Sequence, residues 1–428
     1  MNILLVGSGG REHSLAWKIK QSPLCKRLLI APGNPGMAAL GELLPLKSDD
    51  IPGLVKAARD FAVDLVVVGP EDPLANGLVD ALEAQKIKAF GPKKAAAQLE
   101  SDKAFSKKIM RDAAIPTAEG RAFTSLRSAM SFVESRSEAL VVKAAGLAKG
   151  KGVIMCKDPV EAMDAVRDIM ERKIFGAAGN TVVIEERLEG AEISLLAFVD
   201  GHNAYLLEGA QDHKRIGDND TGPNTGGMGA YSPAPLLTDH VIEKVQREVI
   251  VPLLDTLRRN EIDFQGILYT GLMLTAGGPK VLEFNARFGD PECQPLMMRL
   301  KSDLVEVLLA CVERRLDGIE LEWDERPGVC VVLASEGYGW KPDSQVTKGV
   351  EITGLEEAAK LSVGNDLVVF HGGTALKDGR LVTSGGRVLG VTALGTTIAA
   401  ARQKAYAAID KIRFAGMQYR KDIATRGL

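Results

Sequence analysis

The first hundred residues alternate between short apolar runs and amphipathic stretches, and no other feature of this 428-residue chain constrains its fold as strongly. The apolar runs predict strands at 2–6, 27–30 and 65–68, and the amphipathic stretches predict helices at 12–21, 51–61 and 74–85. Strands that alternate with helices in this way form a parallel sheet covered on both faces. We therefore predict an α/β fold that begins with a doubly wound parallel sheet.

Each of these three strands ends in a loop rich in glycine and proline, and ligands bind at such carboxyl ends in open α/β sheets. A dinucleotide fingerprint would need glycine where Glu12 stands and an acidic residue at the end of the second strand, where the sequence is APGN at 31–34. Both departures disfavour a nicotinamide cofactor. Backbone N–H groups at the start of the first helix favour a phosphate instead. The substrate-binding candidates in these loops are Gly9, Gly10, Arg11, Glu12, Asn34, Pro70 and Glu71.

The run VLEFNARFGDPE, which begins at residue 281, concentrates polar groups at the end of an apolar strand. Side chains alternate along a strand, so we expect Glu283 and Asn285 on one face and Leu282 and Phe284 in the core. A carboxylate and an amide oxygen are ligands that suit Mg²⁺ or Mn²⁺. Arg287 can bind a carboxylate or a phosphate through two parallel hydrogen bonds. The alternative is an edge strand with a solvated polar face and an ordinary turn.

A glycine-rich segment joins two further predicted strands, 139–143 and 152–155. It is not a Walker loop, because Gly152 and not serine or threonine follows Lys151. We interpret it as a flexible cover for a phosphate, with a plain solvated hairpin as the alternative. Lys143 ends an apolar strand, where its ammonium group requires an anionic partner.

These residues together resemble the ATP-grasp carboxylate–amine ligases, in which two α/β lobes clasp ATP. The resemblance implies that lysines contact the ATP phosphates and that a hinge segment binds adenine mostly through its backbone. The implied ATP-binding residues are Lys103, Lys143, Gly150, Lys151, Gly152, Glu185, Glu186, Leu188 and Glu192. The implied metal ligands are Glu283 and Asn285. Many members have a further carboxylate on the preceding strand, and residues 269–274 supply none, so the coordination of a second metal stays open.

Five segments match the glycinamide ribonucleotide synthetase family, the phosphoribosylamine–glycine ligases, in the order of that family. They are GSGGREH from residue 7, GPEDPL from 69, QDHKR from 211, GPNTGGMG from 222 and RFGDPE from 287. The resemblance covers nearly the whole chain. It implies a Rossmann-like substrate domain at 1–102, a two-lobed ATP-grasp domain at 103–324 with a mobile lid lobe at about 122–190, and a small α/β domain at 325–428.

The resemblance implies a reaction of de novo purine biosynthesis. ATP would activate glycine as glycyl phosphate, and 5-phosphoribosylamine would displace the phosphate to give glycinamide ribonucleotide. The implied catalytic residues are Lys151, Asp212, Arg287 and Asp290, and further substrate contacts are Lys214, Asn224 and Gly226. Arg287 would hold the glycine carboxylate, and either Asp212 or Asp290 would pair with the ammonium group. His213 either transfers a proton or has a positioning or structural role.

The carboxy-terminal hundred residues predict strands at 329–334, 367–371 and 388–393 and a helix at 397–412. We interpret this part as a lid or wall without a compact chemical constellation of its own. One helical stretch is expected over 93–113, before the central strands.

Composition narrows the partners and the location. The 53 basic and 56 acidic residues give a net charge of -3, which disfavours a nucleic-acid partner. No apolar run approaches the ~20 residues of a membrane span, and no cleavable leader follows Met1. The five cysteines are scattered, without a C-x-x-C pair, as expected for a reducing cytoplasm. We expect a cytoplasmic monomer with small-molecule substrates.

Three other functions remain possible on the sequence alone. A Rossmann-type dehydrogenase would leave Lys143, Lys151, Glu283 and Asn285 without a role. A non-catalytic ATP-binding protein would not explain Arg287 beside the metal ligands. A related ATP-grasp ligase of purine synthesis could act on another carboxylate.

Overall fold

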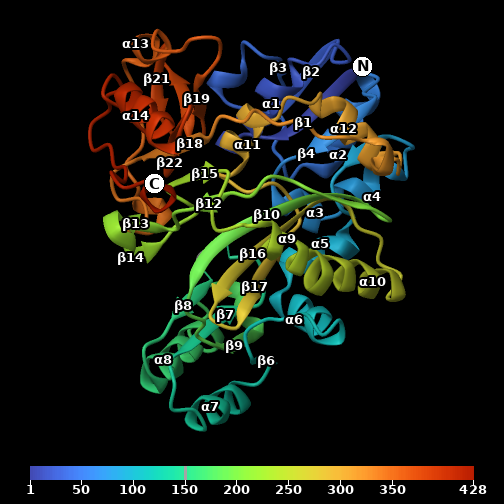
Figure 1. Ribbon diagram of the computed structural model, residues 1–428, viewed down its shortest axis with the longest axis vertical. Helices are drawn as coiled ribbons and strands as arrows, with labels where there is room; N and C mark the ends of the chain where they lie inside the picture. Colours follow the sequence, from blue (N-terminus) through green and yellow to red (C-terminus); the bar gives the residue numbers. More distant parts are fainter. Residues whose placement is uncertain (149–151) are drawn as a thin grey trace.

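The computed structural model describes residues 1–148 and 152–428, and the chain forms three regions that meet around the middle of the molecule (Figure 1). The amino-terminal and carboxy-terminal regions lie side by side at one end of the long axis. The lobe that contains strands β6 to β9 extends at the other end. No helix in the described ranges has both the length and the apolar character needed to cross a membrane.

The amino-terminal region is a parallel five-stranded sheet in the order β3-β2-β1-β4-β5, so the predicted doubly wound sheet is confirmed. Its elements are β1 (Asn2–Gly7), α1 (Gly10–Ile19), β2 (Arg27–Pro32), β3 (Glu42–Leu43), α2 (Ile51–Asp60), β4 (Leu65–Val68), α3 (Glu71–Ala75), α4 (Leu78–Glu83) and β5 (Lys88–Phe90). The single helix predicted at 74–85 is wrong. Gly77 adopts a left-handed conformation at φ +89°, which ends α3 and starts α4.

The helical stretch predicted at 93–113 is also two helices, α5 (Lys94–Ser101) and α6 (Lys103–Asp112). Asp102 between them has extended backbone angles and starts α6, because its carboxylate accepts hydrogen bonds from the N–H groups of Ala104 and Phe105. This capping places Lys103 at the first turn of α6.

Two antiparallel sheets form the central region. The lid sheet has the order β6-β9-β7-β8, and the second sheet has the order β11-β10-β16-β17. The lid elements are β6 (Gly120–Phe123), α7 (Leu126–Glu134), β7 (Leu140–Ala144), β8 (Val153–Met155), α8 (Pro159–Met170) and β9 (Val182–Glu186). The second lobe contains β10 (Ala191–Asp200), β11 (Ala204–Leu206), α9 (Asp239–Val245), α10 (Val251–Arg259), β16 (Gln265–Thr275) and β17 (Gly278–Asn285).

Strand β17 confirms the shared face of Glu283 and Asn285, which pair with Gly271 and Tyr269 of β16. The expectation that Leu282 faces the core is wrong. A β-bulge shifts the register so that Val281, and not Leu282, pairs with the next residue of β16. The extra residue turns Leu282 away from the core, while Phe284 stays buried.

The carboxy-terminal sheet has the order β12-β15-β18-β22-β19 and includes two strands from the middle of the chain. These two are β12 (Gln211–Asp212) and β15 (Gly229–Ser232), and the hairpin β13 (Arg215–Gly217) and β14 (Thr221–Asn224) lies between them in sequence. The other elements are β18 (Gly328–Ala334), α13 (Leu355–Ala359), β19 (Leu367–His371), β20 (Thr374–Lys377), β21 (Arg380–Thr383), β22 (Arg387–Leu394) and α14 (Ile398–Ile409). This pairing fixes the polar loop around Asp212 on the carboxy-terminal region.

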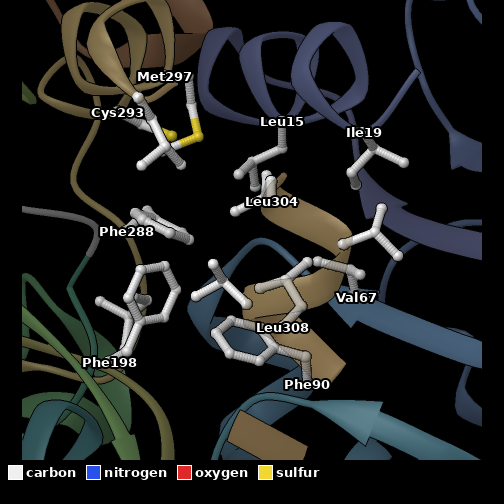
Figure 2. Packing of buried hydrophobic residues seen from close by; sticks show 14 of the residues in the cluster. Leu15, Ile19, Val67, Phe90, Phe198, Phe288, Cys293, Met297, Leu304 and Leu308 are labelled. Carbon is white, nitrogen blue, oxygen red and sulfur yellow. The ribbon is translucent and has the colours of Figure 1, made fainter. Parts of the chain in front are cut away.

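One hydrophobic core joins the amino-terminal sheet to the second central lobe (Figure 2). Leu15 and Val67 come from the first region, Phe198 comes from β10, and Leu304 and Leu308 belong to α12 (Leu304–Val312). Each fully buried leucine or phenylalanine side chain contributes roughly 1.5–3 kcal/mol to folding. The two regions therefore form one platform, on which α11 (Cys293–Arg299) and the loop before it are held.

Candidate active site

A cavity of about 760 Å³ is lined by all three regions of the chain. Most of the predicted site residues are on its wall: Arg11, Glu71, Lys103, Lys143, Gly152, Glu185, Glu186, Leu188, Glu192, Asp212, Lys214, Asn224, Gly226, Glu283, Asn285, Arg287 and Asp290. Gly150 and Lys151 lie outside the described residues. The structure thus brings together side chains separated by nearly three hundred positions in sequence.

One end of the cavity is apolar and lies between the lid sheet and β17. Its lining side chains are Leu99, Met110, Val141, Val153, Met155, Leu188, Met273 and Phe284. Apolar walls of this kind accept flat aromatic groups. Of these residues, only Leu188 was predicted as a site residue. The hydrophobic pattern of a strand or helix does not distinguish an apolar side chain that packs in the core from one that faces a ligand.

Glu185 at this end holds two lysines in place. Its carboxylate contacts Lys107 Nζ at 2.7 Å and Lys143 Nζ at 2.6 Å, and all three side chains are buried. Burial favours the neutral acid, but the two lysines lower the pKa of Glu185. Lys143 also donates to the carbonyl of Leu282 at 3.3 Å, so it links the lid to β17. The anionic partner expected for Lys143 is therefore part of the protein.

Glu283 is surrounded by cations. Lys214 Nζ lies 3.6 Å from its Oε1 and also pairs with Glu192. Burial alone would raise the pKa of Glu283, yet Lys214, Lys143 and Lys103 lower it to about 2. The carboxylate is thus ionised throughout the neutral range.

Glu283 and Asn285 offer one charged and one neutral oxygen ligand on the cavity wall. Among the described residues, no group of three or more His, Cys, Asp or Glu residues is arranged to hold a metal ion. Mg²⁺ commonly takes only one or two protein carboxylates and completes its coordination with substrate phosphates and water. The donor set therefore fits a metal that enters together with a polyphosphate.

Arg287 is held by two carboxylates from the amino-terminal side. Its Nη2 lies 2.7 Å from Glu100, and its Nε lies 3.4 Å from Glu71 without a hydrogen bond. Burial raises the pKa of Glu100, and Arg287 opposes this shift. Glu100 was not predicted, because nothing in α5 alone indicates that it faces Arg287.

Arg387 contributes a charge from the carboxy-terminal region, which corrects its interpretation as a wall without chemistry. Its Nη2 lies 3.2 Å from the carboxylate of Asp290, and its Nη1 donates to the carbonyl of Gly226 at 2.7 Å. The Tyr338 hydroxyl accepts a hydrogen bond from the N–H of Gly226. Arg387 was not predicted, because nothing in the sequence around the start of β22 indicates that it faces Asp290.

The amino-terminal loop is arranged differently from the expected phosphate site. Gly9, Gly10, Glu12, Asn34 and Pro70 do not line the cavity. The carboxylate of Glu12 accepts the N–H of Gly9 at 2.7 Å, so a carboxylate already occupies the loop. Asn34 donates to the carbonyls of Ser8 and His371, both at 2.8 Å, and thereby fastens the amino-terminal region to the carboxy-terminal one.

His213 does not line the cavity, although Asp212 and Lys214 on either side of it do, and it is 1% exposed. Its Nε2 accepts the N–H of Ala424 at 3.3 Å. Burial and the nearby Arg420 lower the pKa of His213 to about 3. These contacts favour the structural role over proton transfer.

Three models of phosphoribosylglycinamide synthetase match the chain: the N domain at residues 1–100, the ATP-grasp (A) domain at 101–293 and the C domain at 328–426. A phosphoribosylamine–glycine ligase of Rhodopirellula baltica is 51% identical, over 100% of this chain and 98% of its own length. The chain belongs to the phosphoribosylglycinamide synthetase family. A second ligase of that name, from Caulobacter vibrioides, is also 51% identical, over 100% of this chain and 99% of its own length.

A solved member of the phosphoribosylglycinamide synthetase family has the same architecture. The crystal structure of phosphoribosylamine–glycine ligase from Thermotoga maritima has a TM-score of 0.85 at 31% identity, covering 99% of this chain and 100% of that one. Family membership confirms the predicted fold class and the ATP-grasp region. Each of the three matched segments contributes residues to the cavity wall: Arg11 comes from the first, Glu283 from the second and Arg387 from the third.

Proposed function

We propose that this protein joins glycine to 5-phosphoribosylamine in an ATP-dependent ligation, giving glycinamide ribonucleotide, ADP and phosphate in purine biosynthesis. The observation that carries the proposal is the shared cavity, where the ionised Glu283 and the cations around it lie beside Arg287 and Asp212. Full-length relatives at 51% identity that are named phosphoribosylamine–glycine ligase support it.

We place ATP at the apolar end, with its phosphates toward Lys103, Lys143 and the glycine-rich segment at 150–152. Glu192 would contact the ribose, and residues 185–188 would border the adenine. A divalent metal, Mg²⁺ or Mn²⁺, would be held by Glu283, Asn285 and the phosphates. When bound, it would neutralise the charge of the transferred phosphoryl group.

In the first step, an oxygen of the glycine carboxylate attacks the γ-phosphorus, and the bond from that phosphorus to ADP breaks. Arg287 would hold the carboxylate and then the acyl phosphate with its guanidinium. The positive charges at Lys103 and Lys143, with Lys151 in the segment outside the described residues, would balance the charge that develops on the phosphoryl oxygens.

In the second step, the amine nitrogen of phosphoribosylamine attacks the acyl carbon, and the bond from that carbon to phosphate breaks. The departing phosphate takes up the proton that the nitrogen loses. The neutral amine is already a nucleophile, so a general base is helpful and not obligatory. Arg11, Glu71, Asn224 and Gly226 would border this substrate where the three regions meet.

We place the 5-phosphate of phosphoribosylamine at the carboxy-terminal end of the cavity, and not in the loop at Gly9 and Gly10. Within residues 1–148 and 152–428, three cations on the cavity wall form no ion pair within 4 Å: Lys103, Arg215 and Lys348. Lys103 lies at the ATP end. Lys348 lies next to the glycine turn before β22, since the N–H of Gly349 donates to the carbonyl of Thr383. A phosphate there avoids the carboxylate of Glu12.

We further propose domain boundaries at 102 and 324, a lid lobe at about 122–190, and a monomer that works in the cytoplasm with small molecules alone. The five described cysteines are free, which supports a reducing compartment.

The direct experiment measures phosphate release from ATP with glycine and freshly made phosphoribosylamine, each omitted in turn. We expect full turnover only with all three substrates and Mg²⁺. If another carboxylate replaces glycine with equal or higher kcat/KM, the protein is a different ligase of the same fold.

A further inference from the structure

Lys107 is a buried lysine that no step of the proposed reaction uses. It lies on α6, four residues after Lys103, and is only 4% exposed. Unlike Lys103 and Lys143, it does not line the cavity. A buried ammonium group is costly unless it is paired, so the contacts of Lys107 show what holds its charge in the protein.

All three donors of the Lys107 ammonium group are used within the protein. Its Nζ lies 2.7 Å from Oε1 of Glu185, donates to the hydroxyl of Thr117 at 3.1 Å and donates to the carbonyl of Ala118. An ammonium group has three N–H donors, so none is left for a substrate. Any effect of Lys107 on a bound ligand must therefore pass through these neighbours.

The three acceptors lie on the two segments that join the lid sheet to the rest of the chain. Thr117 and Ala118 precede β6, where the chain enters the lid, and Glu185 is near the end of β9, where the chain leaves it. Lys107 belongs to α6, which is not part of the lid sheet. Its contacts thus fix the carboxylate of Glu185 relative to α6.

The carboxylate of Glu185 has one lysine at each oxygen. Oε1 faces Lys107, and Oε2 lies 2.6 Å from Nζ of Lys143. Lys143 uses a second donor for the carbonyl of Leu282 at 3.3 Å. Within the described ranges, its third donor has no protein partner, and Lys143 lines the cavity. One N–H group of Lys143 is therefore available to a ligand.

Two lysines and one carboxylate leave this cluster with one surplus positive charge. Without Lys107, Glu185 and Lys143 would form a closed pair with no net charge. An anionic ligand would then gain less from Lys143, because the carboxylate 2.6 Å away would cancel most of its attraction. The surplus charge depends on Lys107, a residue that the ligand does not touch.

We propose that Lys107 is a positioning residue for the ATP phosphates: it neutralises Oε1 of Glu185, so that Lys143 keeps one donor and one uncompensated charge for them. The inference rests on the proposed function, since it concerns the ATP site of that reaction. Lys107 acts through Glu185 and Lys143 and has no contact with ATP of its own.

The test compares the binding of MgATP and of adenosine, which has no phosphates, by calorimetry without glycine. Lys107→Met removes the charge and keeps a long unbranched side chain. We expect its affinity for MgATP to fall about thirtyfold, as for the loss of one interaction with a charged group, and its affinity for adenosine to change less than about twofold. Lys107→Arg keeps the charge and should bind MgATP within about threefold of wild type. Lys108→Met, which changes the exposed lysine next to it on α6, is the matched control and should behave as wild type.

A double variant tests whether Lys107 acts through Glu185. Lys107→Met combined with Glu185→Gln removes one positive and one negative charge, so the surplus positive charge returns to Lys143. We expect this protein to bind MgATP within about threefold of wild type and thus about tenfold more tightly than Lys107→Met alone. A contact between Lys107 and ATP, or a purely structural role, predicts instead that the second substitution weakens binding further or leaves it unchanged.

Three results would overturn the positioning role. They are an unchanged MgATP affinity in Lys107→Met, equal losses of MgATP and adenosine affinity in that variant, and a double variant that binds MgATP no better than the single one. Ligation of glycine by the wild type is measured separately. If it is absent, the proposed function fails, while the MgATP and adenosine affinities still decide the role of Lys107.

Discussion

The ionisation of single site residues depends on the charges around them, and Glu283 is the clearest case. Its carboxylate is the anionic member of the metal-binding pair that we propose on β17, with Lys214 3.6 Å away. We predict that Glu283→Gln lowers kcat at least about a hundredfold at millimolar Mg²⁺, because the neutral amide leaves the metal and the phosphoryl group less well neutralised. Steady-state rates across a Mg²⁺ titration measure this, with circular dichroism as the fold check and Glu320→Gln, an exposed change, as the control. Wild-type rates in a folded variant would remove Glu283 from the metal site.

At the scale of elements, α1 and β19 meet through a buried histidine, His13, and a half-buried one, His371. His13 Nδ1 accepts the N–H of His371 at 2.8 Å, and the two rings lie 5.5 Å apart. Burial lowers the pKa of His13 to about 3 and that of His371 to about 4, so both are neutral in the folded protein at pH 6.5, where the unfolded chain begins to bind protons. Folding stability should therefore fall as the pH drops from 6.5 toward 4. Each histidine contributes a loss of roughly 1 kcal/mol between pH 6.5 and 5.5. Urea unfolding at several pH values measures the slope, which His13→Asn should reduce; an unchanged slope would contradict the assignment.

The whole molecule determines which cations remain available to a substrate, because the three regions contribute complementary groups to one cavity. Arg215 and Lys348, on the cavity wall, form no ion pair with a carboxylate in the described ranges 1–148 and 152–428. We predict that Lys348→Ala and Arg215→Ala each raise the KM for phosphoribosylamine about tenfold, since each removes one charge-assisted contact to the 5-phosphate, with the KM values for ATP and glycine unchanged. Binding of ribose 5-phosphate to the folded variants, followed by calorimetry, checks the same contact without turnover. Lys341→Ala is the matched control, since this exposed lysine of the same segment does not line the cavity. Equal ribose 5-phosphate affinity in all four proteins would return the phosphate to the amino-terminal loop.

The sequence alone predicted the features that depend on residues close to one another in the chain. The alternation of strands and helices determines the parallel sheet, because short crossovers can pack only onto its faces. The spacing of Glu283 and Asn285 places them on one face of β17, because the side-chain period of a strand is two residues. Local patterns predicted helices less well at Gly77 and Asp102, where one left-handed or capping residue interrupts an otherwise helical run.

Only the tertiary structure determined which charges are paired and which are free. Glu100 reaches Arg287 across 187 positions, and Arg387 reaches Asp290 across 97. The loop after β1 was predicted to bind a phosphate, but the carboxylate of Glu12 accepts one of its N–H groups. The bulge in β17 turns Leu282 toward the cavity. Electrostatic pairing and burial depend on distances between segments that are remote in sequence, and no local pattern encodes those distances. That is why the sequence proposed both Asp212 and Asp290 for the ammonium group. In the described part of the chain, the packing pairs Asp290 with Arg387 and leaves Oδ1 of Asp212 without a hydrogen-bond partner.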